Sequence, residues 1–418
     1  MESNVLSKMW TQFKKFGLDY DDFPTMMDNV GLLLWILTIN IQKKWTQGIN
    51  LIFYLMTAIA FSSYFYVYVF SMIWLVCFHY GNKNVEATSV ILAIGLNSII
   101  SGTKIVFMKA NANKIKNTVH NFLKCDSQVI PNTRFAKNLR KNLRVVKKRS
   151  LIIWVTFAIN GLAYLILPLA SPGRHFTIDF FLLYGLEPMT ESPNYEIATV
   201  IFTITSGFAV YSMVGIAIYF LVIVGYNEAQ MYALSEELRN IWNDSQNYYN
   251  NIKHRINDKR QIILIKKQIM NEFIRIRLRD VIKFHITNIN LLYGFNQEFR
   301  ITLAVEYTLL AIAIIAELLG GLEHTYLALP YTIVQMLMDC LAGQRLIDAS
   351  DDFERSVYSC QWENFNMSNR RTVLLMLVMS QKTMVLSAGG FATLNYSFLM
   401  AILKTSYSTY TTLESAVK

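Results

Sequence analysis

The chain has 418 residues, of which 53% are hydrophobic and only 16% are charged. Soluble domains carry about 25% charged residues, so this composition excludes an ordinary soluble enzyme and a disordered or collagen-like chain. The 39 Lys and Arg residues outnumber the 29 Asp and Glu residues, which gives a net charge of +10. In a membrane protein such a surplus reports the orientation of the chain, so we expect no nucleic-acid partner.

Seven apolar segments approach the roughly 20 residues that a helix needs to cross a bilayer. The predicted spans are about 49–76, 87–108, 151–170, 197–225, 301–322, 326–343 and 387–412. The last apolar run is interrupted at Gln381-Lys382 and at Ala388-Gly389-Gly390, so we predict a split seventh helix whose second piece spans. The sequence therefore predicts an all-α protein with seven transmembrane helices. Residues 30–41 are too few to cross and are expected to dip into one leaflet.

The basic residues predict which side each loop faces. Most of the 39 Lys and Arg residues fall in segments 1–46, 109–150, 226–300 and 344–372, and the second of these contains a single acid, Asp126. The positive-inside rule then predicts a cytoplasmic N-terminus and an extracellular C-terminus. This orientation is the reverse of a G-protein-coupled receptor. We expect a multi-pass protein of the plasma membrane without a cleaved signal peptide.

Two segments, 226–300 and 344–383, are predicted to form a cytoplasmic helical anchor or assembly region. Glu228–Trp242 should continue the fourth span as a helix, and the Asn-rich stretch from Asn243 to Asn251 should break it. Arg260–Phe284 has apolar residues at a spacing typical of an amphipathic helix. Three interpretations of this helix stay open: it packs on the protein's own surface, lies on anionic lipid, or pairs with another subunit.

The residues give no sign of catalysis or of a cofactor. The sequence contains no hydrolase, zinc-protease or phosphate-loop motif, and its six His and four Cys residues are scattered without metal-ligand spacing. We therefore predict no enzyme activity, no metal and no cofactor. Acids within spans suggest ion transport. Glu306 and Asp339 are expected near the cytoplasmic helix ends, within reach of water, and Glu317 near the outer end, so a transporter's central charge pair is not predicted.

Residues near the C-terminus carry a resemblance to a known family. They are Cys340-Leu341-Ala342-Gly343 at the end of the sixth span, the pair Tyr358 and Trp362, Ser380-Gln381-Lys382, and Ser406-Tyr407-Ser408. In order and spacing this set resembles the insect odorant receptors. The chain lacks the large insertion in the fourth-to-fifth loop of that family's shared co-receptor, so it resembles a ligand-tuned subunit, with some likeness to moth pheromone receptors. Gustatory-type receptor channels and G-protein-coupled receptors are the alternatives.

The resemblance implies a ligand-gated, non-selective cation channel. A co-receptor would be the partner in a hetero-oligomer, and a tetramer is the expected stoichiometry. The last helix would line the pore, with its hydroxyl-rich wall wet but without selective charge. The residues implied for the pore and gate are Tyr407, Tyr410, Leu413, Ala416 and Val417. Those expected at subunit contacts are Phe273, Ile276, Tyr358 and Trp362.

The resemblance also implies a ligand pocket in the outer half of the bundle. A mostly apolar cavity with a few hydroxyls suits a small volatile molecule, an odorant or a pheromone, because burial drives affinity and hydrogen bonds orient the ligand. The residues expected there are Ile91, Leu92, Gly95, Phe157, Asn160, Gly161, Tyr164, Phe202, Thr205, Ser206, Ala209, Tyr326, Leu329, Tyr331 and Gln335.

Overall fold

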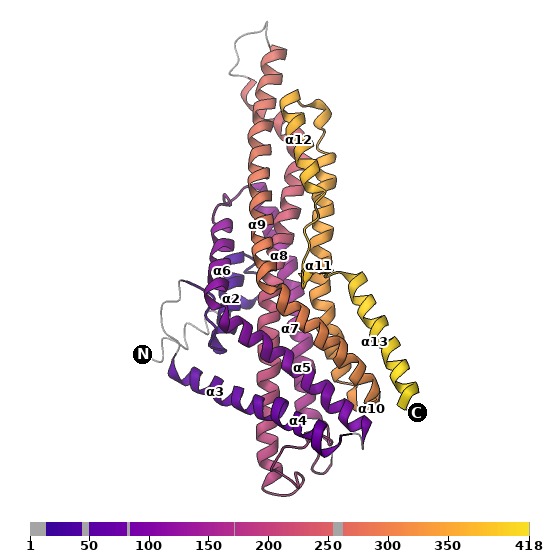
Figure 1. Cartoon of the computed structure of the whole chain (residues 1–418). Coiled ribbons are helices and arrows are strands. Elements are labelled where there is room, and N and C mark those ends of the chain that lie inside the picture. The colour runs from indigo at the N-terminus through magenta and orange to yellow at the C-terminus, as the bar shows by residue number, and fades with distance from the viewer. Residues whose placement is uncertain (1–13, 44–49, 82–83, 171, 254–261, 418) are drawn as a thin grey trace.

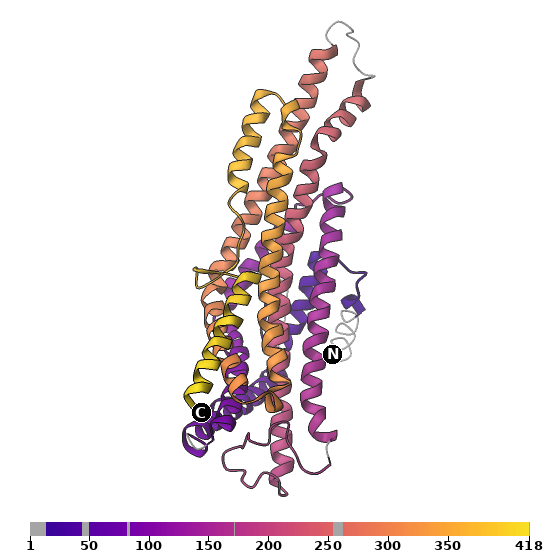
Figure 2. The same cartoon turned by 90° about the vertical axis from the view of Figure 1, so that its right-hand side faces the viewer.

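The computed structural model describes residues 14–43, 50–81, 84–170, 172–253 and 262–417. These ranges leave out residues 1–13, the beginning of the first predicted span and the start of the predicted Arg260–Phe284 helix. Within them the chain is almost wholly helical, which confirms the all-α prediction. The helices form an elongated bundle, and the C-terminal helix leans away from its side (Figures 1 and 2).

Four long helices form the axis of the bundle. They are α7 (Arg134–Ala170), α8 (Asn194–Ile252), α9 (Ile262–Leu319) and α11 (Ala328–Tyr358). At 1.5 Å per residue, the 59 residues of α8 extend about 90 Å, roughly three times the thickness of a hydrocarbon core. The end of α8, the start of α9 and the end of α11 lie together at the top of Figure 1. This projecting end must extend beyond any bilayer that the rest of these helices cross.

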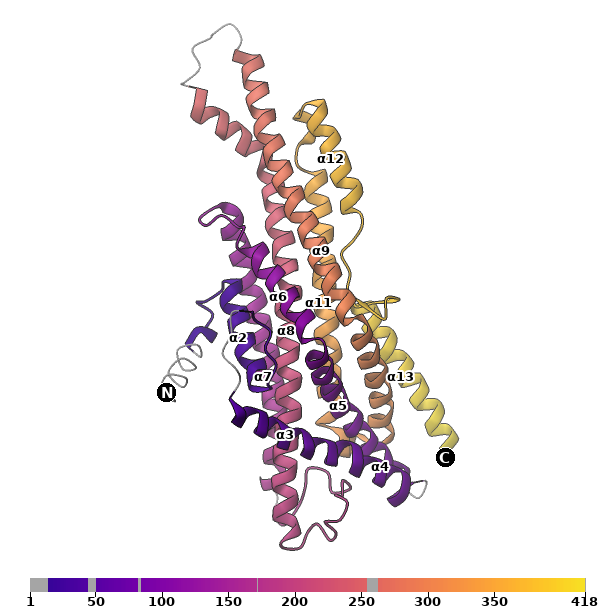
Figure 3. The same cartoon turned by 60° about the vertical axis from the view of Figure 1, so that its left-hand side comes forward.

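The N-terminal third wraps one side of this axis. The short turn η1 (Lys14–Phe16) precedes α2 (Phe23–Ile36), which packs on α8. A continuous helix then runs from α3 (Leu51–Phe65) through the π-helical turns η2 (Tyr66–Ser71) and η3 (Leu75–His79), with α4 (Met72–Trp74) between them. It crosses the bundle obliquely before α5 (Val85–Ala110) returns and α6 (Ala112–Asp126) follows (Figure 3).

The C-terminal elements differ from the predicted boundaries. After α10 (Leu322–Thr325) and α11 come η5 (Trp362–Asn364) and α12 (Met367–Ser380). The seventh span was expected from residue 387, but Ser387–Ala388 and Ala392–Thr393 pair as an antiparallel hairpin, β1 and β2. Gly389 and Gly390 form its turn at φ values of 66° and 87°, which favour glycine. The last helix, α13, therefore begins only at Tyr396 and ends at Val417.

The predicted helix break between Asn243 and Asn251 is wrong, because α8 continues through Ile252. Packing overrides the low helix propensity of the asparagines. Ser245 and Tyr249 are buried, and the ring of Tyr248 stacks on Phe273 of α9 with centroids 4.9 Å apart. The amphipathic start of α9 thus packs on the protein's own α8, as the first of the three interpretations proposed.

The apolar surface of the lower bundle is consistent with a membrane. Five helices in the described part of the chain are long and apolar enough to cross one: Leu51–His79, Val85–Ala110, Arg134–Pro168, Asn194–Ile252 and Leu264–Leu319. Helices α3 and α7, on the outside of the bundle, expose many large apolar side chains, including Leu51, Ile52, Ile159 and Leu162. Such exposed rows are suited to lipid contact.

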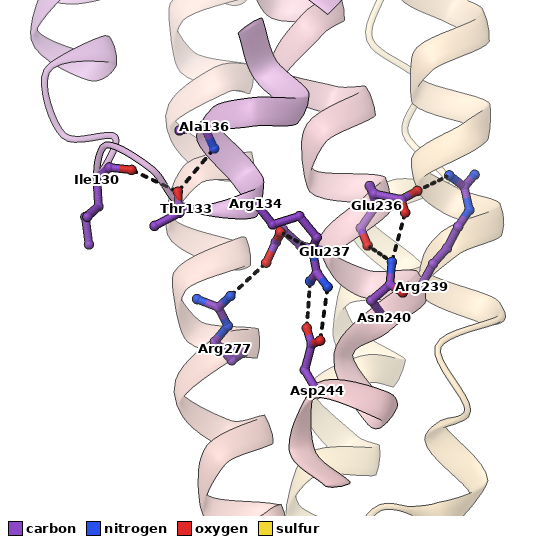
Figure 4. A network of polar contacts seen from close by, with 10 residues as sticks. All are labelled: Ile130, Thr133, Arg134, Ala136, Glu236, Glu237, Arg239, Asn240, Asp244 and Arg277. Carbon is purple, nitrogen blue, oxygen red and sulfur yellow. Dashed lines mark hydrogen bonds and ion pairs between the residues drawn. The ribbon is translucent and has the colours of Figure 1, made fainter. Parts of the chain in front are cut away.

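An ion-pair network ties the projecting helices together (Figure 4). Arg134, at the start of α7, binds Asp244 of α8 through both terminal nitrogens, at 3.0 and 2.6 Å, and binds Glu237 through Nε at 2.8 Å. Arg277 of α9 reaches the other oxygen of Glu237 at 2.8 Å. Arg239 of α8 pairs with Asp352 of α11 at 2.5 Å. Bidentate guanidinium–carboxylate contacts fix the relative positions of these helices.

Asp126 ends α6 at the junction with α2 and α8. Phe23 and Phe122 pack on the ring of Tyr226 in this junction, with centroids 4.1 and 5.9 Å away. Burial raises the pKa of Asp126 to about 6, the nearby carboxylate of Asp22 adds to the rise, and a hydrogen bond with Tyr226 opposes it. The folded protein therefore holds this proton to a higher pH than the unfolded chain does.

This junction predicts how stability depends on pH. Between pH 4 and 6 the unfolded chain loses the Asp126 proton while the folded protein keeps it, so thermal stability should fall as pH rises across that window. Asp126→Asn should remove this fall and stabilise the protein above pH 6 by about 2 kcal/mol. Unfolding midpoints of the detergent-solubilised protein, measured from pH 4 to 8, test this. Parallel curves for both proteins would contradict it.

Candidate functional site

A cavity of about 80 Å³ lies among α5, α7, α8, α11 and the continuous helix Leu51–His79. Its wall is mostly apolar with several hydroxyls and amides. The lining residues are Tyr68, Ile94, Asn97, Ser98, Ser101, Asn160, Gly161, Tyr164, Ser206, Ala209, Val210, Leu327, Ala328 and Tyr331. This composition is typical of small-molecule sites, in which apolar burial supplies affinity and a few polar groups orient the ligand.

The structure brings part of the predicted ligand set together around this cavity. The predicted residues that line it are Asn160, Gly161, Tyr164, Ser206, Ala209 and Tyr331. They come from the three helices α7, α8 and α11. Phe202 lies nearby, in the wall of a neighbouring cavity that it shares with Tyr164 and Ser206.

Other predicted ligand residues lie outside the cavity wall. On α5, Gly95 contacts Met72, so tightly that a Cβ would overlap the Met72 sulfur. Phe157 is buried and packs edge-on against Tyr331, and Thr205 is buried with its hydroxyl bonded to the Ile201 carbonyl at 2.5 Å. Tyr326 is 52% exposed. Four further predicted residues that do not line the cavity are Ile91, Leu92, Leu329 and Gln335.

Sequence reasoning missed about half of the wall. On α5 the lining residues are Ile94, Asn97, Ser98 and Ser101, and the last three lie further along the helix than the predicted residues. The polar character of these three was a signal that could have identified this face. Tyr68 was missed because the first span was not expected to contribute. The oblique crossing of that helix carries its π-helical part to the cavity.

A second cavity of about 60 Å³ adjoins the first. Tyr164 and Ser206 line both, so these two side chains form a shared wall. The rest of its lining is largely aromatic and aliphatic, from the ends of α7 and α8 and the connection between them. Those residues are Leu165, Pro168, His175, Phe176, Thr177, Ile178, Phe181, Tyr195, Thr199, Phe202 and Thr203.

A buried polar cluster adjoins the wall of the first cavity. Asn97 of α5 donates to Glu317 of α9 at 2.7 Å and to the hydroxyl of Thr332 of α11 at 2.8 Å. Thr332 in turn donates to the same Glu317 oxygen at 2.6 Å. Glu317 lies near the end of α9, as expected, and is fully buried. The cluster joins three helices by hydrogen bonds, which fixes the position of the Asn97 side chain.

A buried ion pair lies further along the same helices and corrects a second expectation. Lys104 of α5 contacts Glu306 of α9 at 2.6 Å, and Gln335 of α11 donates to the same carboxylate at 2.8 Å. Glu306 and Asp339 were expected to reach water, but they are only 1% and 2% exposed. A central charge pair, which the sequence did not predict, is therefore present. The positive charge of Lys104 offsets the cost of burying the Glu306 carboxylate.

The helix expected to line a pore, α13, is covered on only one side. Leu399 and Ser406 are buried, and the Ser406 hydroxyl donates to the Ala311 carbonyl of α9 at 3.4 Å. Tyr407 is 60% exposed and Leu413 41% exposed, whereas Tyr410 is half-buried. Exposed hydroxyl residues dominate the open side: Thr405, Ser408, Thr409, Thr411 and Thr412. The side chains of Ala416 and Val417 lie outside the described part of the chain.

The predicted assembly residues gather at the projecting end. Tyr358, Trp362 and Ile276 are exposed, whereas Phe273 is half-buried against Tyr248. The adjoining α12 also exposes an apolar surface, which consists of Met367, Leu374, Leu375, Val378 and Met379. Charged helix surfaces are ordinary at a water-exposed end, so this concentration of exposed apolar side chains is unusual.

Comparison with known proteins identifies the family. Residues 84–407 match the model of the family described as 7tm odorant receptor. This chain belongs to that family. The match confirms the resemblance seen in the C-terminal residues and places the chain among receptors rather than enzymes. No curated protein matches it significantly.

Two solved structures share the fold of this odorant receptor. The insect olfactory receptor OR5 from Machilis hrabei has a TM-score of 0.73 at 13% identity, with 93% of this chain and 97% of that chain covered. The same receptor in complex with eugenol gives 0.72 at 13% identity, covering 94% and 100%. The likeness extends over nearly the whole length of both proteins, so the receptor has the fold of a multi-pass, seven-helix membrane protein.

The ion pair predicts a specific stability defect in the receptor. Lys104→Met should leave the Glu306 carboxylate buried without a positive charge beside it, at a cost of about 3–5 kcal/mol, and so reduce the amount of folded receptor in the membrane. Glu306→Gln added to Lys104→Met should restore much of that loss. Size-exclusion profiles of the solubilised receptor measure the folded amount. Lys109→Met, at an exposed lysine of the same helix, is the matched control, and an equal effect of both Met variants would refute the pair's role.

Proposed function

We propose that this chain is the ligand-tuned subunit of an odorant-gated, non-selective cation channel in the plasma membrane. The observation that carries the proposal is the pairing of a mostly apolar cavity with a helix, α13, whose hydroxyl-rich side has no cover in the single chain. A small volatile ligand, an odorant or a pheromone, would bind in the cavity. The relative solved with eugenol supports a small-molecule ligand.

The open side of α13 is suited to a pore. Hydroxyl side chains keep a channel wall wet and offer no charge that would select one cation. Leu413 and Val417 would form the hydrophobic gate near the helix end, because a ring of apolar side chains closes a pore by dewetting. Four α13 helices around one axis would give each a covered side against its own bundle and an open side toward ions.

Assembly with a co-receptor fits the projecting end of the bundle. The exposed apolar side chains of α12, together with Tyr358, Trp362 and Ile276, would be buried between subunits of a heterotetramer. The ion-pair network of Arg134, Glu237 and Asp244 would keep this end rigid enough to dock. The basic residues of the same end favour the cytoplasm, which leaves the C-terminus of α13 outside.

The experiment is electrical recording from cells that express this chain with the family's co-receptor. Volatile ligands from a broad panel should evoke a cation current that persists when G-protein signalling is blocked. Cells with the co-receptor alone are the control, and they should respond only to a co-receptor agonist. A current that needs G-protein coupling would favour the alternative class of receptor. Silence to every volatile, despite surface expression, would refute the proposal.

A further inference from the structure

Two tyrosine hydroxyls in the cavity make no hydrogen bond within the described part of the chain. Tyr164 comes from α7 and Tyr331 from α11, and both side chains line the cavity between these helices. Tyr68 lines the same cavity, so three phenol groups surround it. Both residues are half-buried and their hydroxyls face the cavity, so a ligand that supplies an acceptor gains a hydrogen bond there.

Several neighbouring polar groups in the wall already have hydrogen-bond partners. The hydroxyls of Tyr68 and Ser206 pair with each other at 3.2 Å, and Ser101 donates to the Ser98 carbonyl at 3.1 Å. Asn160 donates to the Leu327 carbonyl at 3.2 Å. Of the three phenol groups in the wall, those of Tyr164 and Tyr331 therefore keep a free donor for a ligand, one from α7 and one from α11.

We infer that the cavity selects volatile ligands that carry a carbonyl oxygen, such as aldehydes, ketones and esters, over hydrocarbons of the same shape, and that Tyr164 and Tyr331 donate to that oxygen. A carbonyl oxygen has two lone pairs and can accept from both phenols at once. The described cavity wall contains no carboxylate, so it offers no partner for a cationic amine. This inference rests on the proposed function for its biological meaning, but the binding preference itself does not require a channel.

The position of the two donors also orients the rest of the ligand. Tyr164 and Ser206 are the wall shared with the second cavity, whose lining is rich in Phe176, Phe181 and Phe202. A cavity of about 80 Å³ holds a carbonyl group and a short piece of chain, so a longer apolar tail must extend past Tyr164 into the aromatic space. The carbonyl group would then lie between Tyr164 and Tyr331, and the tail among the phenylalanines.

The test uses two matched probe pairs, octanal with octane and benzaldehyde with toluene. In thermal unfolding of the purified, detergent-solubilised receptor, a carbonyl probe should raise the unfolding midpoint more than its hydrocarbon does. Tyr164→Phe and Tyr331→Phe should each weaken binding of the carbonyl probe about fivefold, the loss of one neutral hydrogen bond, and leave hydrocarbon binding unchanged. Tyr326→Phe is the control, since Tyr326 is exposed and lies outside the cavity.

The outcomes separate this inference from the proposed function. Equal stabilisation by carbonyl and hydrocarbon in both pairs, or a Tyr→Phe change that weakens both equally, would overturn the inference. If the carbonyl preference is measured but no ligand evokes a current in cells, the inference holds and the proposed channel function fails. Unfolding midpoints of the ligand-free variants within a degree or so of the parent would show that the fold is intact.

Discussion

The apolar interior of a bilayer cannot satisfy polar groups, and this constraint governs how the helices of this receptor meet. Lys104, Glu306 and Gln335 join α5, α9 and α11 at one depth, and Asn97, Glu317 and Thr332 join the same three helices at another. Each of these buried polar side chains has its hydrogen-bond or ion-pair partner on a neighbouring helix. The helices are thereby held in one register, and the cavity forms beside the second cluster.

The same contacts connect the cavity with the last helix. Tyr331 lines the cavity, and Gln335, one turn along α11, donates to Glu306 of α9. The next residue of α9, Tyr307, donates to the Met336 carbonyl at 3.3 Å and packs on Phe398 of α13 with centroids 5.1 Å apart. These contacts form a contiguous set that runs from the cavity wall to the proposed pore helix.

Hydropathy was enough to predict the all-α fold, because bilayer thickness limits helix length directly. Residue-level features of the cavity were harder to predict. Which face of α5 lines the cavity depends on the oblique path of the helix Leu51–His79. That path places Tyr68 in the cavity wall and Met72 against Gly95. Likewise, the Lys104–Glu306 pair joins residues far apart in the sequence, and no local pattern indicates it. The continuity of α8 depends on packing against α9.

The central claim is that α13 lines an ion pathway opened by ligand, and cysteine modification tests it most directly. Cys77 is the exposed native cysteine among the four, so the background should be Cys77→Ser. With Tyr407→Cys in that background, a charged thiol reagent applied from outside should change the ligand-evoked current, faster in the presence of ligand than in its absence. Labelling of Tyr407→Cys that leaves the current unchanged would contradict the account.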